Sequence, residues 1–146
     1  MLVKKSLKEL ISLLRSKDYT YASGCGLMMQ LAIGLSLIEM SLEISKSHNN
    51  DLDYEPLIGI CQSGINKALE YLENDHQVLV EYRIKKDSTL LLQSTQQQLE
   101  LTIYLIEQLH GLENEVYLPA KADYLAGINS LTMIKKSLLK NYQMTM

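Results

Sequence analysis

The chain has 146 residues, enough for one domain around a single continuous core and too few for two. Hydrophobic residues make up 47% of it and charged residues 21%, a balance typical of globular proteins and not of disordered ones. The chain has fourteen Lys and Arg and seventeen Asp and Glu, which gives a net charge of −3. Because there is no excess of positive charge to neutralise a phosphate backbone, the composition argues against nucleic-acid binding. We therefore expect one globular domain spanning residues 1–146.

The cysteines and histidines argue against a secreted protein and against a metal site. Cys25 and Cys61 form no CxxC pair and no disulfide framework, which favours a reducing, cytoplasmic location. The three histidines, His48, His76 and His110, lack metal-ligand spacing. We expect no bound metal and no tightly bound cofactor.

The first segment predicts an amphipathic helix. Apolar residues recur at helical spacing, and charged residues, mostly lysines, occupy the opposite face. The apolar residues are Val3, Leu7, Leu10, Ile11 and Leu14.

The second segment carries no charge from Ala22 to Ile38, which approaches the length of a membrane span. Glycine, glutamine and serine residues dilute it, however, and Glu39 ends it. After a break at residues 18–26, the apolar run from Leu27 continues to about Ile44, and polar residues at 47–50 indicate a turn. Because this helix is apolar nearly all round, we interpret it as the central buried helix of a protein that does not span a membrane.

A third helix is predicted from about Asp53 to Ile84, with Pro56 tolerated in its first turn. Its apolar stripe is interrupted by two polar residues, Asp75 and His76. This interruption is the first local anomaly in the sequence. If both side chains face the interior, burial would bring them toward a neutral pKa as an acid–base pair; the alternative is that the helix frays or rotates and both are solvated.

Two further helices follow, at about Thr89 to Leu109 and after Pro119. Asp123 lies in the first turn of the last helix, where a carboxylate also has the simple role of stabilising the helix dipole. Five helices joined by short links predict an all-α, up-and-down bundle. We expect a homodimer, because Met28, Met29, Leu35 and Leu37 lie on faces that a five-helix monomer does not fully cover.

The segment Ser23-Gly24-Cys25-Gly26 opens the apolar helix and would leave backbone N–H groups accessible to an anionic or carbonyl group. The alternative is a flexible turn and cap. Cys25 could act as a nucleophile if the helix N-terminus lowers its thiol pKa, or pack as a small apolar side chain.

The start of the second helix resembles that of the formiminotransferase-cyclodeaminase family. The family has a stretch that reads approximately Ser-Pro-Thr-Pro-Gly-Gly-Gly-Ser before a helix rich in small residues; aligned without gaps, Thr20, Gly24, Gly34 and Met40 match. The family also has an aspartate late in its third helix, at the position of Asp75, and a Ser-Asp pair at the start of a later helix, where this chain has Ala122-Asp123.

The departures fall within the family's glycine motif and its Ser-Asp pair. Tyr21, Ala22 and Ser23 replace a proline and two glycines, and Cys25 and Ala122 each replace a serine. The chain is also shorter than is usual for the family.

The resemblance implies a helical homodimer that binds a reduced folate and acts on its one-carbon group, as a formimidoyltetrahydrofolate cyclodeaminase or a methenyltetrahydrofolate cyclohydrolase. Asp75 and Asp123, with His76, are then the candidate catalytic residues, and Ser23, Gly24, Cys25 and Gly26 would approach the pterin. A second hypothesis keeps the fold as a catalytically inactive homodimeric scaffold for a small molecule or a protein. A third is an unrelated helical bundle.

Overall fold

The computed structural model of the chain describes residues 1–48 and 52–146, and within these ranges it contains helices and no strand. Five α-helices and three short 3-10 helices follow one another along the chain, which confirms the predicted all-α class. Part of the predicted turn at 47–50 lies outside the described residues. The elements are η1 (Leu2–Lys4), α1 (Leu7–Leu14), η2 (Tyr19–Tyr21), α2 (Ser23–His48), α3 (Glu55–Lys85), α4 (Thr89–Leu109), η3 (Leu118–Ala120) and α5 (Lys121–Thr145).

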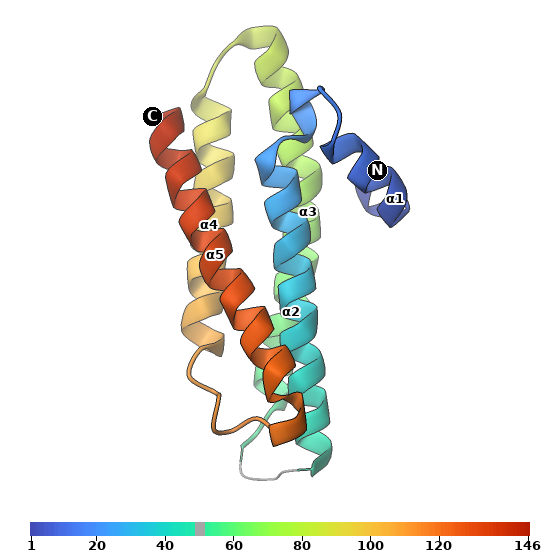
Figure 1. Cartoon of the computed structure of the whole chain (residues 1–146). Coiled ribbons are helices and arrows are strands. Elements are labelled where there is room, and N and C mark those ends of the chain that lie inside the picture. The colour runs from blue at the N-terminus through green and yellow to red at the C-terminus, as the bar shows by residue number, and fades with distance from the viewer. Residues whose placement is uncertain (49–51) are drawn as a thin grey trace.

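The four long helices alternate in direction and form an up-and-down bundle (Figure 1). Helix α2 packs against α3 and α5, and α4 packs against the same two helices on the other side of the core. Helix α1 stands beside one end of this bundle and contains no fully buried residue. The core is therefore built by four of the five helices.

Helix α2 contributes more buried residues than any other described helix, as its nearly uniform apolar character predicts. The exposed apolar residues of α2 differ from those that the sequence analysis expected. Met28 and Leu35 are fully buried within the single chain, whereas Ile33 and Met40 are exposed.

The stretch Tyr19–His48 has the length and hydropathy of a membrane span, but half of its most apolar window is buried by the other helices, as in the core helix of a soluble protein.

Two glycines bring α2 and α5 into close contact. A Cβ atom on Gly127 would lie 2.6 Å from the carbonyl oxygen of Gly34, and one on Gly34 would lie 3.2 Å from the Cβ of Ser130. A side chain at Gly127 would therefore force the two helices apart.

At the end of the bundle where α4 leads into α5, buried polar groups hold the connecting loop. The Tyr124 hydroxyl donates to the Leu109 carbonyl (2.6 Å) and accepts from the Leu112 N–H (3.0 Å). The backbone N–H of Tyr117 donates to the Ser45 hydroxyl at 2.8 Å. These bonds satisfy the backbone of a loop that lies against the core.

Candidate functional site

Asp75 lies on α3 with only 7% of its surface exposed, and among the described residues it is the one carboxylate in the buried class. Its Oδ1 accepts a hydrogen bond from the side-chain amide of Gln98 on α4, at 2.9 Å. Its Oδ2 accepts one from the thiol of Cys25 on α2, at 3.6 Å. Side chains from three helices thus meet at this carboxylate.

The carboxylate of Asp75 lies directly against the first turn of α2. A Cβ atom on Gly24 would lie 2.2 Å from Oδ1, closer than any real contact, so glycine is the residue that permits this approach. The backbone N–H of Cys25, which donates to the Ala22 carbonyl, also lowers the pKa of the carboxyl group slightly. Asp75 therefore stabilises the positive end of the α2 dipole from a neighbouring helix.

Burial and hydrogen bonding act on the pKa of Asp75 in opposite directions. Burial raises the pKa of this carboxyl group above its usual value, and the hydrogen bonds from Gln98 and Cys25 oppose that shift only in part. A carboxyl group that keeps its proton closer to neutral pH can act as a general acid or base.

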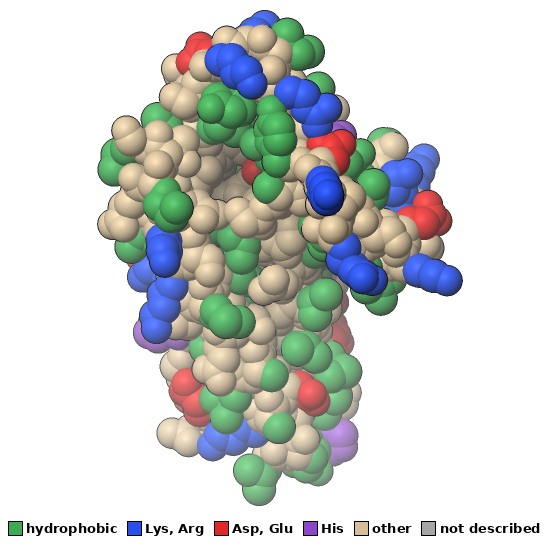
Figure 2. Space-filling view, turned by 45° about the horizontal axis from the view of Figure 1, so that its top comes forward, with side chains coloured by type: hydrophobic (Ala, Val, Ile, Leu, Met, Phe, Trp, Pro, Cys, Tyr) green, Lys and Arg blue, Asp and Glu red, His purple; other side chains and the backbone are tan. Residues whose placement is uncertain are grey.

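A cleft of about 350 Å³ opens beside Asp75 at the end of the bundle where α2 begins. Figure 2 looks toward this end, and the molecular surface there is hollowed between the helices. The Asn141 side chain of α5 donates to the Ser23 hydroxyl of α2 at 3.0 Å and bridges the two helices at the rim. The cleft is lined by Ala22, Ser23, Gly24, Asp75, Leu79, Leu91, Thr95, Gln98, Asn141, Met144 and Thr145.

Gln98 is a site residue that the sequence analysis missed. It is buried, bonds Asp75 and lies 3.4 Å from the Ser94 hydroxyl one turn earlier. The sequence does contain a signal, because Ser94, Gln98 and Thr102 recur every four residues along the buried side of α4. A polar stripe at this spacing on an apolar helix face indicates polar partners within the core.

The predicted loop Ser23-Gly24-Cys25-Gly26 is instead the first turn of α2, which begins four residues before the predicted start at Leu27. Gly24 and Ser23 line the cleft, whereas Gly26 faces a neighbouring groove. Cys25 is buried and donates toward Asp75 and the Leu72 carbonyl.

The hypothesis of a lowered Cys25 pKa is wrong. Burial raises the pKa of the Cys25 thiol well above its ordinary value, and the nearby Asp75 carboxylate raises it further. Burial likewise raises the pKa of Cys61 to about 12. A raised pKa disfavours the thiolate, which is the nucleophilic form, and Cys25 instead packs as a small buried side chain, the alternative given above.

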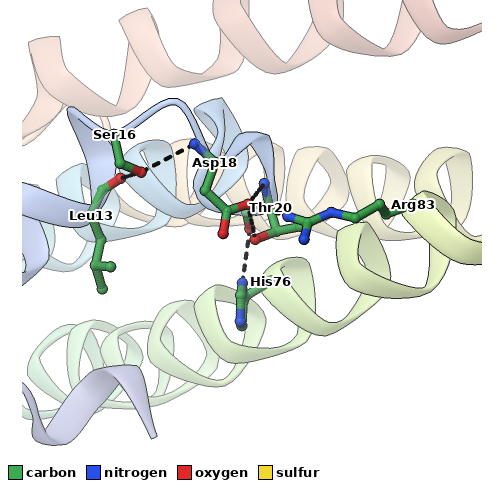
Figure 3. A network of polar contacts seen from close by, with 6 residues as sticks. All are labelled: Leu13, Ser16, Asp18, Thr20, His76 and Arg83. Carbon is green, nitrogen blue, oxygen red and sulfur yellow. Dashed lines mark hydrogen bonds and ion pairs between the residues drawn. The ribbon is translucent and has the colours of Figure 1, made fainter.

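His76 does not join Asp75 as an inward-facing acid–base pair. Its Nδ1 donates to the carbonyl of Thr20 at 3.0 Å, and its ring stacks on Tyr21 with 4.3 Å between the ring centroids. In Figure 3, Thr20 also bonds the Asp18 carboxylate, which forms an ion pair with Arg83 of α3. His76 and Arg83 thus fasten η2 to the outer side of α3.

Asp123 lies in the first turn of α5, at the opposite end of that helix from the cleft residue Asn141. Eighteen residues of helix separate the two, which corresponds to about 27 Å along the axis. Within one chain, Asp123 therefore does not meet Asp75.

The site has the composition of a small-molecule cleft. Among residues 1–48 and 52–146, no three His, Cys, Asp or Glu side chains lie close enough together to hold a metal ion. The groups around the cleft are one buried acid, amides, hydroxyls and apolar side chains. Such a set is suited to a polar organic molecule held by hydrogen bonds and apolar contact.

The fold and the site together define an antiparallel helical bundle with a buried carboxylate beside an open cleft. No protein-family model matches the sequence, and no curated protein matches it significantly. The structure is similar to the crystal structure of a formiminotetrahydrofolate cyclodeaminase from Thermotoga maritima, with a TM-score of 0.88 over 99% of this chain and 80% of that one. The two sequences are 12% identical, so the likeness shows a shared fold.

Proposed function

We propose that this protein binds a reduced folate in the cleft beside Asp75 and acts on its one-carbon group, as a formimidoyltetrahydrofolate cyclodeaminase or a methenyltetrahydrofolate cyclohydrolase. The observation that carries the proposal is the buried Asp75 carboxyl beneath Gly24, because it places an acid–base group at the wall of an open cleft. The cyclodeaminase fold, shared over 99% of the chain, supports the choice of ligand.

The chemistry needs one group that exchanges protons next to a cationic carbon centre. In cyclodeamination, the formimino group starts in its protonated, cationic form, and N10 of the folate loses its proton as it attacks the formimino carbon. The bond from that carbon to the leaving nitrogen then breaks as this nitrogen takes up that proton and departs as ammonia. In hydrolysis of the methenyl form, water adds to the same carbon and its oxygen loses both protons to become the formyl oxygen, while the bond from that carbon to N5 breaks and N5 takes up one of these protons. Asp75 could accept or return the proton in either reaction, and its ionised form stabilises the cation.

The space around Asp75 is large enough for part of a folate. The cleft of about 350 Å³ lies within the usual range for small-molecule sites. It shares Ala22, Ser23 and Asn141 with a neighbouring groove of about 450 Å³ between α2 and α5. A flat ring system beside Asp75 could therefore extend its substituent over the first turn of α2.

Calorimetric titration with 5-formyltetrahydrofolate tests the proposal. We expect a dissociation constant on the order of micromolar for the wild type and binding weakened about tenfold or more by Asp75→Asn. Glu107→Gln, which changes an exposed carboxylate at the other end of α4, is the matched control and should leave binding unchanged. Absence of binding by the folded wild type at millimolar ligand would contradict the proposal.

A second candidate function, a scaffold without catalysis, has its own supporting observation. Both oxygens of Asp75 already accept hydrogen bonds from within the protein, so the residue also has a structural role. Turnover of 5-formiminotetrahydrofolate or methenyltetrahydrofolate separates the two candidates. Binding without turnover above that of Asp75→Asn would favour the scaffold.

A further inference from the structure

Gln98 of α4 is the most buried of the residues that line the cleft. Only 1% of its surface is exposed, although it forms part of the cleft wall beside Asp75. A glutamine buried to this degree normally has hydrogen-bond partners for both ends of its amide group, the nitrogen and the oxygen. The two ends of the Gln98 amide differ in this respect.

The amide nitrogen of Gln98 has partners within the protein. Nε2 donates to Oδ1 of Asp75 at 2.9 Å and lies 3.4 Å from the hydroxyl oxygen of Ser94. Because an amide nitrogen carries two N–H groups, these two contacts use both of them. An ionised carboxylate can only accept hydrogen bonds, so the nitrogen of the amide, and not its oxygen, faces Asp75.

The amide oxygen of Gln98, Oε1, accepts no hydrogen bond from residues 1–48 or 52–146. Every fully buried side-chain nitrogen or oxygen in this part of the chain does have a partner. Oε1 is therefore accessible from outside the protein, and the cleft is the cavity that Gln98 lines. The cleft wall thus carries a free hydrogen-bond acceptor next to the acid.

The charge of Asp75 keeps the amide in this orientation. If the amide turned over, Oε1 would take the place of Nε2 at 2.9 Å from the carboxylate oxygen. Two acceptors would then face each other without a proton between them, which is unfavourable in a buried site. The Gln98 oxygen therefore faces the cleft while Asp75 is ionised.

An acceptor beside a carboxylate is complementary to a ligand group that has N–H donors and a positive charge. None of the residues that line the cleft is Lys, Arg or His. A protonated formimino group has both properties that this wall requires. A formyl group has nearly the same shape but presents an acceptor oxygen at the same position, and that oxygen would meet Oε1 of Gln98 acceptor to acceptor.

We infer that Gln98 determines which one-carbon group the cleft accepts: its amide oxygen binds the N–H donor of a formimino group and disfavours the oxygen of a formyl group. The inference rests on the proposed function, because it concerns the folate that binds beside Asp75. Gln98 exchanges no proton in this role. One hydrogen bond to a charged donor corresponds to a preference of about tenfold or more for the formimino form.

An NMR titration with pH tests the orientation of the amide without a ligand. The side-chain N–H resonances of Gln98 in the ¹⁵N-labelled wild type should shift as Asp75 titrates, whereas those of the exposed Gln97 should not. Asp75→Asn should abolish the shift, although Cys25 and His76, the other titratable groups next to Asp75, remain in that variant. Resonances of Gln98 that do not respond to pH in the wild type would overturn the inference.

A comparison of two folates tests the specificity. Gln98→Met keeps the length of the side chain and removes the amide, so it should weaken binding of 5-formiminotetrahydrofolate about tenfold and should not weaken binding of 5-formyltetrahydrofolate. Gln97→Met is the matched control, because it makes the same change at the next, exposed residue of α4. In an active protein the two affinities are read as kcat/KM for the formimino form and as the inhibition constant of the formyl form. In an inactive protein both come from calorimetry.

The possible failures are distinguishable. If the folded wild type binds neither folate, the proposed function is contradicted, and this inference with it. If the wild type binds both but Gln98→Met weakens neither, or weakens both equally, Gln98 does not select the one-carbon group, and the proposed function stays intact. A selective loss of the formimino form in Gln98→Met, absent from Gln97→Met, is the result that we expect.

Discussion

The two ends of the bundle use buried polar groups in different ways. At the end where α4 leads into α5, the Tyr124 hydroxyl and the Ser45 hydroxyl bond backbone atoms and close a loop. At the cleft end, Asp75 is bonded by the side chains of Gln98 and Cys25, and an open cleft lies beside it.

The two ends therefore differ in the role of their buried polar groups, which is structural at one end and functional at the other. A buried hydroxyl that pairs with backbone satisfies groups that folding has already taken from water. A buried carboxylate costs stability through its desolvation, and side chains from two other helices are arranged to bond it. We therefore expect substitutions at one end to change stability alone, and those at the other to change stability and ligand binding together.

The largest effect should come from Gly24→Ala. The added methyl group would collide with the Asp75 carboxylate, which a Cβ would approach to 2.2 Å, and we expect a loss of about 2 to 3 kcal/mol in unfolding free energy together with loss of ligand binding. Urea denaturation and calorimetry measure the two quantities. Gly26→Ala is the matched control two residues on, where the Cβ would meet only Leu14 at 3.8 Å, and it should stabilise α2 by up to about 1 kcal/mol. Equal effects of the two alanines would show that the contact with Asp75 does not matter.

Tyr124→Phe should have an intermediate effect confined to stability. It leaves the Leu109 carbonyl and the Leu112 N–H without their partner, at a cost of about 1 to 2 kcal/mol, and it should leave folate affinity unchanged because the residue lies at the opposite end from the cleft. Tyr104→Phe, at a half-exposed position, should change stability by less than about 0.5 kcal/mol. Reduced folate binding in a folded Tyr124→Phe protein would contradict the separation of the two ends.

The smallest effect should be a pH-dependent difference in melting temperature between Asp75→Asn and the wild type. Because burial raises the pKa of Asp75 in the folded state, the wild type has its full stability at pH values below the unfolded-state pKa and loses stability as the pH rises through the folded-state pKa. The melting temperature of Asp75→Asn should therefore rise relative to the wild type from about pH 4 upward. Parallel pH curves for the two proteins would mean that the pKa of Asp75 is not raised.

The helices themselves were predictable because periodicity is a local property. The predicted fourth helix, Thr89 to Leu109, has the observed bounds, and Pro56 lies in the first turn of α3 as expected. The start of α2 was predicted too late, because Gly24 and Gly26 favour a turn when read alone. The Asp75 carboxylate from α3 is what stabilises that first turn, and no local pattern contains it.

The candidate site was predictable only in part. The anomaly on the α3 stripe identified Asp75, but consecutive residues of a helix point about 100° apart, so Asp75 faces the core while His76 lies under η2. Gln98 was missed because its role depends on α4 lying beside α3. The catalytic role of Asp123 stays a prediction, and the residue lies in the first turn of α5, at the opposite end of that helix from the cleft.

The sequence by itself determined that this protein is a helical bundle with an apolar central helix, because the spacing of apolar residues specifies which side of each helix is buried. Tertiary structure alone decided which polar residues meet. Gly24, Asp75 and Gln98 are far apart in the chain, and they come together only because α2 and α4 both pack against α3. The desolvation that raises the pKa of Asp75 comes from the same packing, since three helices together exclude the water that any one of them would leave in place.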